Sequence, residues 1–199
     1  MTPRSDAPVS SSGRIEVITG CMFSGKTEEL LRRLRRAEIA DQEVEVFKPS
    51  VDDRYSEEEV GSHSGRTWGA RVVNPESKNL EERFLEPKAD VVAVDEANFF
   101  EPSLVPVLEK LSGSGTRVIV TGLDQTFRGE PFTPVPELMA RAEYVDKLRA
   151  ICARCGGEAT KTQRMIDGEP AHVDDPTILV GADESYEARC RECHEVRTE

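Results

Sequence analysis

The chain has 199 residues, of which 37% are hydrophobic and 32% are charged, and its formal net charge at pH 7 is −12. This length can bury one core with a small appended module, and no apolar run in the sequence is long enough to form a transmembrane helix. A net charge this negative argues against a non-specific nucleic-acid binder, which would carry a basic surface.

The N-terminal segment, residues 1–12, lacks the apolar stretch of a secretory signal. We therefore expect a short disordered tail on a cytoplasmic protein. Acidic residues outnumber basic ones, and lysine is scarce, which is compatible with a salt-adapted organism. In that case activity and stability would differ strongly between low and molar KCl.

A phosphate-binding sequence, G-x-x-x-x-G-K-[ST], lies between a strand expected at 15–18 and a helix expected at 27–40. Strand, glycine-rich loop and helix N-terminus together form an anion-binding arrangement. Its glycines allow the tight turn, its lysine supplies a charge for the β- and γ-phosphates, and its threonine offers a hydroxyl to Mg²⁺. An ordinary glycine-rich turn is the alternative interpretation. The expected ATP-binding residues here are Gly20, Cys21, Met22, Phe23, Ser24, Gly25, Lys26 and Thr27.

Further along the chain, apolar runs alternate with helical patterns, as in an α/β domain with a mainly parallel sheet flanked by helices. The polar stretch from 50 to 67 is expected to be a long functional or mobile loop. The predicted nucleotide-binding domain spans 13–150, and residues 151–199 form a second, smaller domain. Within the first domain we expect strands at 43–47, 91–94 and 117–121, and helices at 102–111 and 139–148.

Two acidic residues, Asp95 and Glu96, follow the strand expected at 91–94. An acid in that position lies at the carboxyl edge of the sheet, where open α/β sheets bind ligands. Asp95 fits a residue that holds Mg²⁺. Glu96 fits a group that polarises a water molecule or accepts a proton from a substrate hydroxyl. A solvated acidic turn is the alternative interpretation.

Four of the five cysteines form two C-x-x-C pairs, one on each side of residues 156–189. In a reducing compartment this pattern indicates a tetrahedral structural zinc site. Two disulfides are the alternative, and a catalytic zinc is disfavoured because four thiolates leave no open coordination position. The ion would stabilise the fold and fix both ends of the intervening segment. The expected ligands are Cys152, Cys155, Cys190 and Cys193.

The two nucleotide signatures allow three classes of protein: a small-molecule kinase, an ATPase motor or helicase-like protein, and a regulatory nucleotide-binding protein. A motor needs more length and a basic or aromatic groove for nucleic acid. The many acidic side chains of residues 151–199 would repel nucleic acid, which favours the small-molecule kinase.

Along residues 13–194 the chain resembles the zinc-containing class of thymidine kinases. This resemblance rests on the phosphate-binding loop with Met-Phe inside it, on both cysteine pairs, and on several further motifs. These motifs are Asp53-Arg54-Tyr55-Ser56, Ser62-His63, Asp95-Glu-Ala-Asn-Phe-Phe100, Leu123-Asp-Gln-Thr-Phe127 followed by Pro131-Phe132, and Gly181-Ala182-Asp183 with Tyr186.

The resemblance implies a P-loop NTPase-like fold in which Glu96 is the general base for the 5′-hydroxyl of thymidine. It implies that Thr27 and Asp95 hold Mg²⁺, and that the ATP site extends to Asp95, Glu96, Ala97 and Asn98. The segment between the cysteine pairs would be a lasso loop that covers thymine. Met22, Phe99, Leu123, Phe127, Thr162 and Tyr186 would line the nucleoside pocket, with ordinary core packing as the alternative for each.

The resemblance also implies thymidine and ATP as substrates, a homotetramer, and inhibition by dTTP. In the stretch from 50 to 67, Arg54 either reaches phosphate or is solvated, and the resemblance gives no role for His63.

Overall fold

The computed structural model describes residues 13–50, 59–61, 67–77, 79–85, 88–178 and 184–199. At its centre is a six-stranded sheet with the order β5-β2-β6-β7-β1-β8, in which all neighbouring strands are parallel. The predicted parallel α/β sheet is therefore confirmed. Its strands are β1 (Arg14–Thr19), β2 (Val44–Pro49), β5 (Arg71–Val73), β6 (Val91–Val94), β7 (Arg117–Gly122) and β8 (Tyr144–Lys147).

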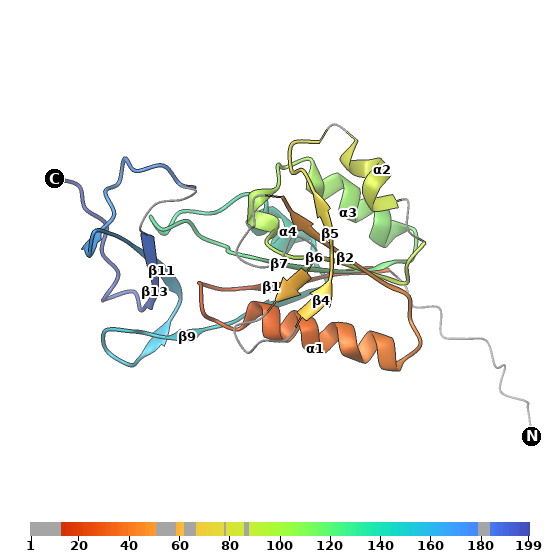
Figure 1. The fold of residues 1–199 in the computed structure, drawn as a ribbon, viewed down its shortest axis with the longest axis horizontal. Helices are drawn as coiled ribbons and strands as arrows, with labels where there is room; N and C mark the ends of the chain where they lie inside the picture. Colours follow the sequence, from red (N-terminus) through yellow and green to blue (C-terminus); the bar gives the residue numbers. More distant parts are fainter. Residues whose placement is uncertain (1–12, 51–58, 62–66, 78, 86–87, 179–183) are drawn as a thin grey trace, which may run out of the picture.

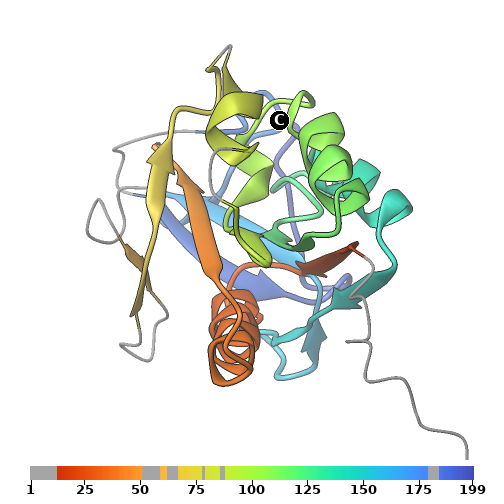
Figure 2. The same cartoon turned by 90° about the vertical axis from the view of Figure 1, so that its right-hand side faces the viewer.

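Helices cover both faces of this sheet (Figures 1 and 2). Helix α1 (Lys26–Ile39) lies on one face, and α2 (Leu80–Leu85), α3 (Leu104–Gly113) and α4 (Val135–Arg141) lie on the other. Successive side chains of a strand point to opposite faces, so β6 sends two valines to the core under α3 and α4 and sends Val91 and Ala93 to the core under α1. Burial on both faces explains its continuous apolar sequence.

The strands β6, β7 and β1 are neighbours and end at the same edge of the sheet. In their register Val94 of β6 lies beside Val120 of β7, which lies beside Val17 of β1. The residues that follow β1 and those that follow β6 therefore emerge on one side, two strand spacings or about 10 Å apart. A 3-10 helix, η1 (Ala97–Phe99), follows the acidic pair.

The C-terminal residues form small antiparallel sheets at one end of the molecule, on the left in Figure 1. Strand β9 (Ala150–Ile151) pairs with β10 (Glu158–Ala159). Strand β11 (Lys161–Ile166) lies between β12 (Glu169–Pro170) and β13 (Glu184–Arg189). The division of the chain at residue 150 stays a prediction.

Two expectations about local structure differ from what is observed. The prediction of a helix at 139–148 is wrong, because α4 ends at Arg141 and Tyr144–Lys147 forms β8 beside β1. Pairing with the edge of the sheet overrides the local helical pattern there. In the expected loop at 50–67, Glu59–Gly61 forms β3, which pairs with β4 (Thr67–Gly69). The rest of that stretch, from 51 to 58 and from 62 to 66, lies outside the described residues.

In the parts of the chain that the structure describes, no helix combines the length and apolar character needed to cross a bilayer.

Candidate active site and metal site

The phosphate-binding loop connects β1 to α1 through backbone conformations that favour glycine. Gly20 has φ 142° and Gly25 has φ 85°, and between them Phe23 also has a positive φ of 64°. A Cβ atom added to Gly20 would lie 2.5 Å from the carbonyl oxygen of Leu148. Only glycine fits this position, both because of its φ and because of the neighbouring backbone.

The side chain of Lys26 is held across this loop. Lys26 is 8% exposed, and its Nζ donates a hydrogen bond of 3.0 Å to the carbonyl oxygen of Cys21. Ser24 Oγ is buried and has no hydrogen-bond partner among the described residues. A buried hydroxyl without a partner needs an explanation, and a ligand in the loop would supply one. Thr27 lies in the first turn of α1, where the helix dipole favours an anion.

The two acids predicted at the sheet edge follow β6 directly. Asp95 is buried, and its Oδ1 accepts hydrogen bonds from the hydroxyl of Thr121 and, at 3.1 Å, from the backbone N–H of Glu96. Glu96 is partly exposed and has φ 51°, a left-handed conformation that is unusual for a residue with a side chain. Such conformations persist only where neighbours fix them, and they are common at functional sites.

Of the other residues predicted near ATP, Asn98 and Ala97 make structural contacts. Asn98 Oδ1 accepts a hydrogen bond of 2.9 Å from the backbone N–H of Leu123. This bond joins η1, which contains Phe99, to the residue after β7. The side chain of Ala97 lies in the hydrophobic core, so only its backbone could contact a ligand.

The remaining residues predicted for the nucleoside pocket connect the phosphate-binding loop to the C-terminal strands. The backbone N–H of Met22 donates to Thr162 Oγ1 at 3.1 Å. The ring of Phe127 lies 5.3 Å from the guanidinium carbon of Arg164, and Arg164 is opposite Tyr186 in the pairing of β11 with β13. Met22 and Phe127, two of the predicted pocket residues from the first part of the chain, thus each contact a residue of β11.

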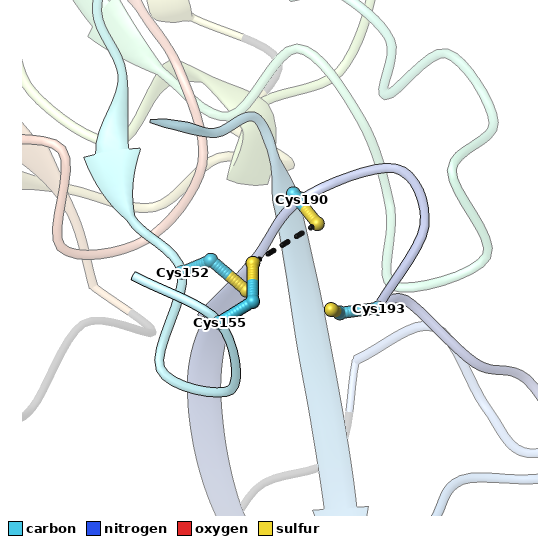
Figure 3. A group of neighbouring side chains, drawn as sticks. All are labelled: Cys152, Cys155, Cys190 and Cys193. Carbon is cyan, nitrogen blue, oxygen red and sulfur yellow. Dashed lines mark hydrogen bonds between the residues drawn. The ribbon is translucent and has the colours of Figure 1, made fainter. Parts of the chain in front are cut away.

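The four paired cysteines form one cluster (Figure 3). Their sulfur atoms all lie within 4.8 Å of one another, and Sγ of Cys155 is 3.7 Å from Sγ of Cys190. A tetrahedral zinc with Zn–S bonds of about 2.3 Å places its sulfurs about 3.8 Å apart, so the cluster fits this ion. All five cysteines of the chain lie within the described residues and are free thiols, which argues against the disulfide alternative. The cluster could hold a metal such as zinc.

Crowding of the sulfurs affects their protonation. A hydrogen bond with Cys190 and then burial, followed by hydrogen bonds with Cys155 and Cys152, raise the pKa of Cys193 to about 12. A bound cation would reverse this preference, because it favours the thiolate form of its ligands.

Cys21 in the phosphate-binding loop packs against this C-terminal part. It belongs to a small hydrophobic cluster, and its thiol donates to the carbonyl oxygen of Ala159 at 3.5 Å. Burial raises the pKa of Cys21, so the side chain stays a neutral thiol. The other buried members of the cluster are Ala150, Cys152, Ala159 and Ala188.

Three residues of the site were not found from the sequence. Thr121 donates a hydrogen bond to Asp95. It is a polar residue at the end of an apolar strand, and this position could have identified it as a candidate site residue. Arg164 is completely buried, and Arg128 bonds to the C-terminal segment, but nothing in the sequence distinguishes them from solvated arginines. Arg54 and His63 lie outside the described residues.

Comparisons with known proteins agree with the resemblance noted in the sequence. The thymidine kinase family model matches residues 13–194. A thymidine kinase of Halobacterium salinarum is 62% identical over 192 residues, which cover 96% of this chain and 98% of the relative. A thymidine kinase of Haloquadratum walsbyi is 55% identical over 222 residues, with 96% of this chain and 99% of the relative covered. The chain belongs to the thymidine kinase family.

Proposed function

We propose that this chain transfers the γ-phosphoryl group of ATP to the 5′-hydroxyl of thymidine, giving dTMP and ADP. One observation carries this proposal: in a member of the thymidine kinase family, the phosphate-binding loop after β1 and the acidic pair after β6 open at the same edge of the sheet. The loop suits the phosphate donor, and an acid beside it suits activation of an acceptor hydroxyl.

Glu96 is the proposed general base. As the 5′-oxygen of thymidine bonds to the γ-phosphorus, its proton passes to the Glu96 carboxylate, and the electron pair of the breaking P–O bond leaves with ADP. The hydrogen bonds from the Glu96 N–H to Asp95 Oδ1 and Thr121 Oγ1 fix the backbone from which this side chain projects. Because the transition state of phosphoryl transfer is loose, such positioning is a large part of catalysis.

Lys26 is proposed to stabilise the negative charge of the donor phosphates. Its Nζ is already held by the Cys21 carbonyl oxygen, so the ammonium group needs little rearrangement when ATP binds. Since the side chain is mostly buried, its charge is screened less than that of a surface lysine.

Thr27 and Asp95 are the proposed residues for Mg²⁺. A hydroxyl and a carboxylate are oxygen donors, which this hard cation prefers. Bound with ATP, the ion would neutralise charge on the β- and γ-phosphates. Thr121 keeps the Asp95 carboxylate in place through its hydroxyl.

The cysteine cluster is proposed to hold a structural Zn²⁺, which would fix the two ends of residues 156–189. Fixing both ends lowers the entropy lost when a loop closes over a substrate. In this proposal the segment covers thymine. The nucleoside lies next to the hydrogen bond between Met22 and Thr162, which joins the phosphate-binding loop to β11.

We also propose a cytoplasmic homotetramer that is inhibited by dTTP. A thymidine nucleotide with three phosphates carries both groups that the site would recognise, the nucleoside and the phosphate chain.

The test of the reaction is incubation of the purified protein with ATP, Mg²⁺ and each of several deoxynucleosides, with detection of the monophosphate product. Formation of dTMP supports the proposal. ATP hydrolysis that is stimulated by DNA, without any nucleoside monophosphate, contradicts it and favours a P-loop ATPase with a zinc-bearing nucleic-acid module.

The role of Glu96 is tested with Glu96→Gln. We expect kcat to fall by about 100-fold or more while ATP affinity stays near that of the wild type, because a general base contributes roughly 10²–10⁴-fold. Glu101→Gln, a change at an exposed residue of the same region, is the control and should leave kcat unchanged. A Glu96→Gln enzyme that keeps more than about a tenth of wild-type kcat removes Glu96 from this role.

A further inference from the structure

One arginine attaches a C-terminal segment, residues 173–177, to the nucleotide-binding domain. Arg128 lies in the connection from β7 to α4. Its Nε donates to the carbonyl oxygen of Val173 at 2.6 Å, its Nη1 donates to Thr177 Oγ1 at 2.7 Å, and its Nη2 donates to the carbonyl oxygen of Asp175. A planar guanidinium group can reach three acceptors at once, so a single side chain fixes the course of the segment.

The same guanidinium group also contacts Phe127, a residue proposed for the nucleoside pocket. Its central carbon lies 4.4 Å from the centroid of the Phe127 ring, in the range of a cation–π contact. Arg164, which is 5.3 Å from that ring, donates from Nη1 to the carbonyl oxygen of Pro176 at 2.5 Å. The Phe127 ring and the segment are thus held in relation to each other by two arginines.

The segment depends on these polar contacts because it has little hydrophobic anchorage. None of residues 173–178, all of which the structure describes, belongs to the buried core, and Ile178 is 46% exposed. Other backbone bonds of the segment join Val173 to Arg197, near the C-terminus, and Asp175 to the nearby His172. These bonds do not reach the nucleotide-binding domain, whereas those of Arg128 do.

We propose that Arg128 is a positioning residue for the acceptor nucleoside. It sets the segment 173–177 and the Phe127 ring at the separation that the nucleoside requires. This inference rests on the proposed function, in which the loop between the cysteine pairs covers thymine. Loss of Arg128 should therefore weaken binding of thymidine. Binding of ATP should be nearly unchanged, since the described hydrogen bonds from the phosphate-binding loop to the C-terminal residues go to Thr162 and Ala159.

The experiment compares Arg128→Met with wild type and with Arg141→Met as a matched control. Arg141 likewise donates hydrogen bonds from its guanidinium group, but to the exposed carboxylates of Glu109 and Glu137. For Arg128→Met we expect KM for thymidine to rise about tenfold or more, because several charge-assisted hydrogen bonds are lost. KM for ATP should stay within about twofold. Amide hydrogen exchange should increase in residues 173–177 with bound zinc unchanged.

Two further variants should give smaller increases in KM for thymidine than Arg128→Met. Arg128→Lys keeps the charge but cannot reach three acceptors in one plane, so its KM for thymidine should be intermediate. Thr177→Val removes one acceptor with little change in shape and should give a smaller rise in the same direction. It also keeps the test decisive if Arg128→Met does not fold, because Arg128 is intact in it.

The inference is overturned if Arg128→Met, or in its place Thr177→Val, keeps wild-type KM for thymidine. It is also overturned if KM for thymidine and KM for ATP rise equally, because that result indicates a general structural role. Failure of the proposed function is a separate result: a wild-type protein that makes no dTMP contradicts the function, while exchange in residues 173–177 still reports whether Arg128 holds the segment.

Discussion

Replacement of Glu16 by glutamine tests how strongly a buried ion-pair network stabilises this fold. Glu16 lies in β1 with only 7% of its side chain exposed. Its carboxylate accepts hydrogen bonds from Arg14 at 2.8 Å, from Arg33 of α1 at 2.9 Å and from Arg117 of β7 at 2.7 and 2.9 Å. Burial alone would raise the pKa of Glu16, but the bonds from Arg117 and Arg14 outweigh it and lower the pKa from 4.5 to about 2.

This pKa sets the size of the expected effect. A decrease from 4.5 to about 2 corresponds to about 3 kcal/mol of stabilisation of the ionised carboxylate in the folded protein. Removing one partner of a buried ion pair costs about 3–5 kcal/mol, which agrees in size. We therefore expect Glu16→Gln to lower the free energy of unfolding at pH 7 by about 3 kcal/mol.

The direction of the pH dependence follows from the same shift. Because the pKa of Glu16 is lower in the folded state, its contribution is fully present above pH 4.5 and is lost as the pH falls toward about 2. The difference between wild type and Glu16→Gln should thus decrease as the solution is acidified below pH 4.5.

Urea unfolding followed by circular dichroism measures this difference. The control is Glu109→Gln, which removes a carboxylate from an exposed pair with Arg141 and should have no measurable effect. The difference in free energy of unfolding between wild type and Glu16→Gln should be the same at low and at molar KCl, because buried ion pairs are screened little by salt. A difference below about 1 kcal/mol at pH 7, or one that does not decrease on acidification, would refute the reasoning.

Two further predictions concern the metal cluster and the phosphate-binding loop. Cys152→Ser should lower zinc content, melting temperature and thymidine affinity together, because one of the four proposed ligands is lost; unchanged zinc content and melting temperature would show that the four-cysteine assignment is wrong. Gly20→Ala should lower the melting temperature and raise KM for ATP, since the added Cβ meets the Leu148 carbonyl oxygen at 2.5 Å and φ is 142°; strain of this kind costs roughly 1–3 kcal/mol. Gly113→Ala, where an added Cβ meets nothing within 4 Å, is the control, and equal ATP affinity in both variants contradicts the argument about the loop.

The features predicted correctly from the sequence depend on local patterns. The apolar run of β6, the helix after the phosphate-binding loop and the parallel sheet follow from spacing and hydrophobicity within short windows. Strands β5 and β8 were not predicted, because β5 has only three residues and all of β8 is exposed. Only their pairing with β2 and β1 makes them strands.

In the candidate site, too, features with a local sequence pattern were predicted and features that depend on distant residues were not. The cysteine pairs and the acids after β6 have recognisable spacings, and the structure brings each set together. By contrast, the left-handed conformation of Glu96 and the three-way contact of Arg128 arise from residues far apart in the chain. No local pattern predicts contacts of that kind.

The hydrogen bond from Met22 to Thr162 joins residues that are 140 positions apart, and Cys21 packs on Ala159 nearby. Contacts at such separation form after local ones, because closing a long loop is entropically costly. During synthesis the phosphate-binding loop would leave the ribosome early, but its contact with β11 must wait until most of the chain has been made. On the proposed function, the growing polypeptide would therefore lack a complete site for both substrates until the residues up to Cys190 and Cys193 had been added.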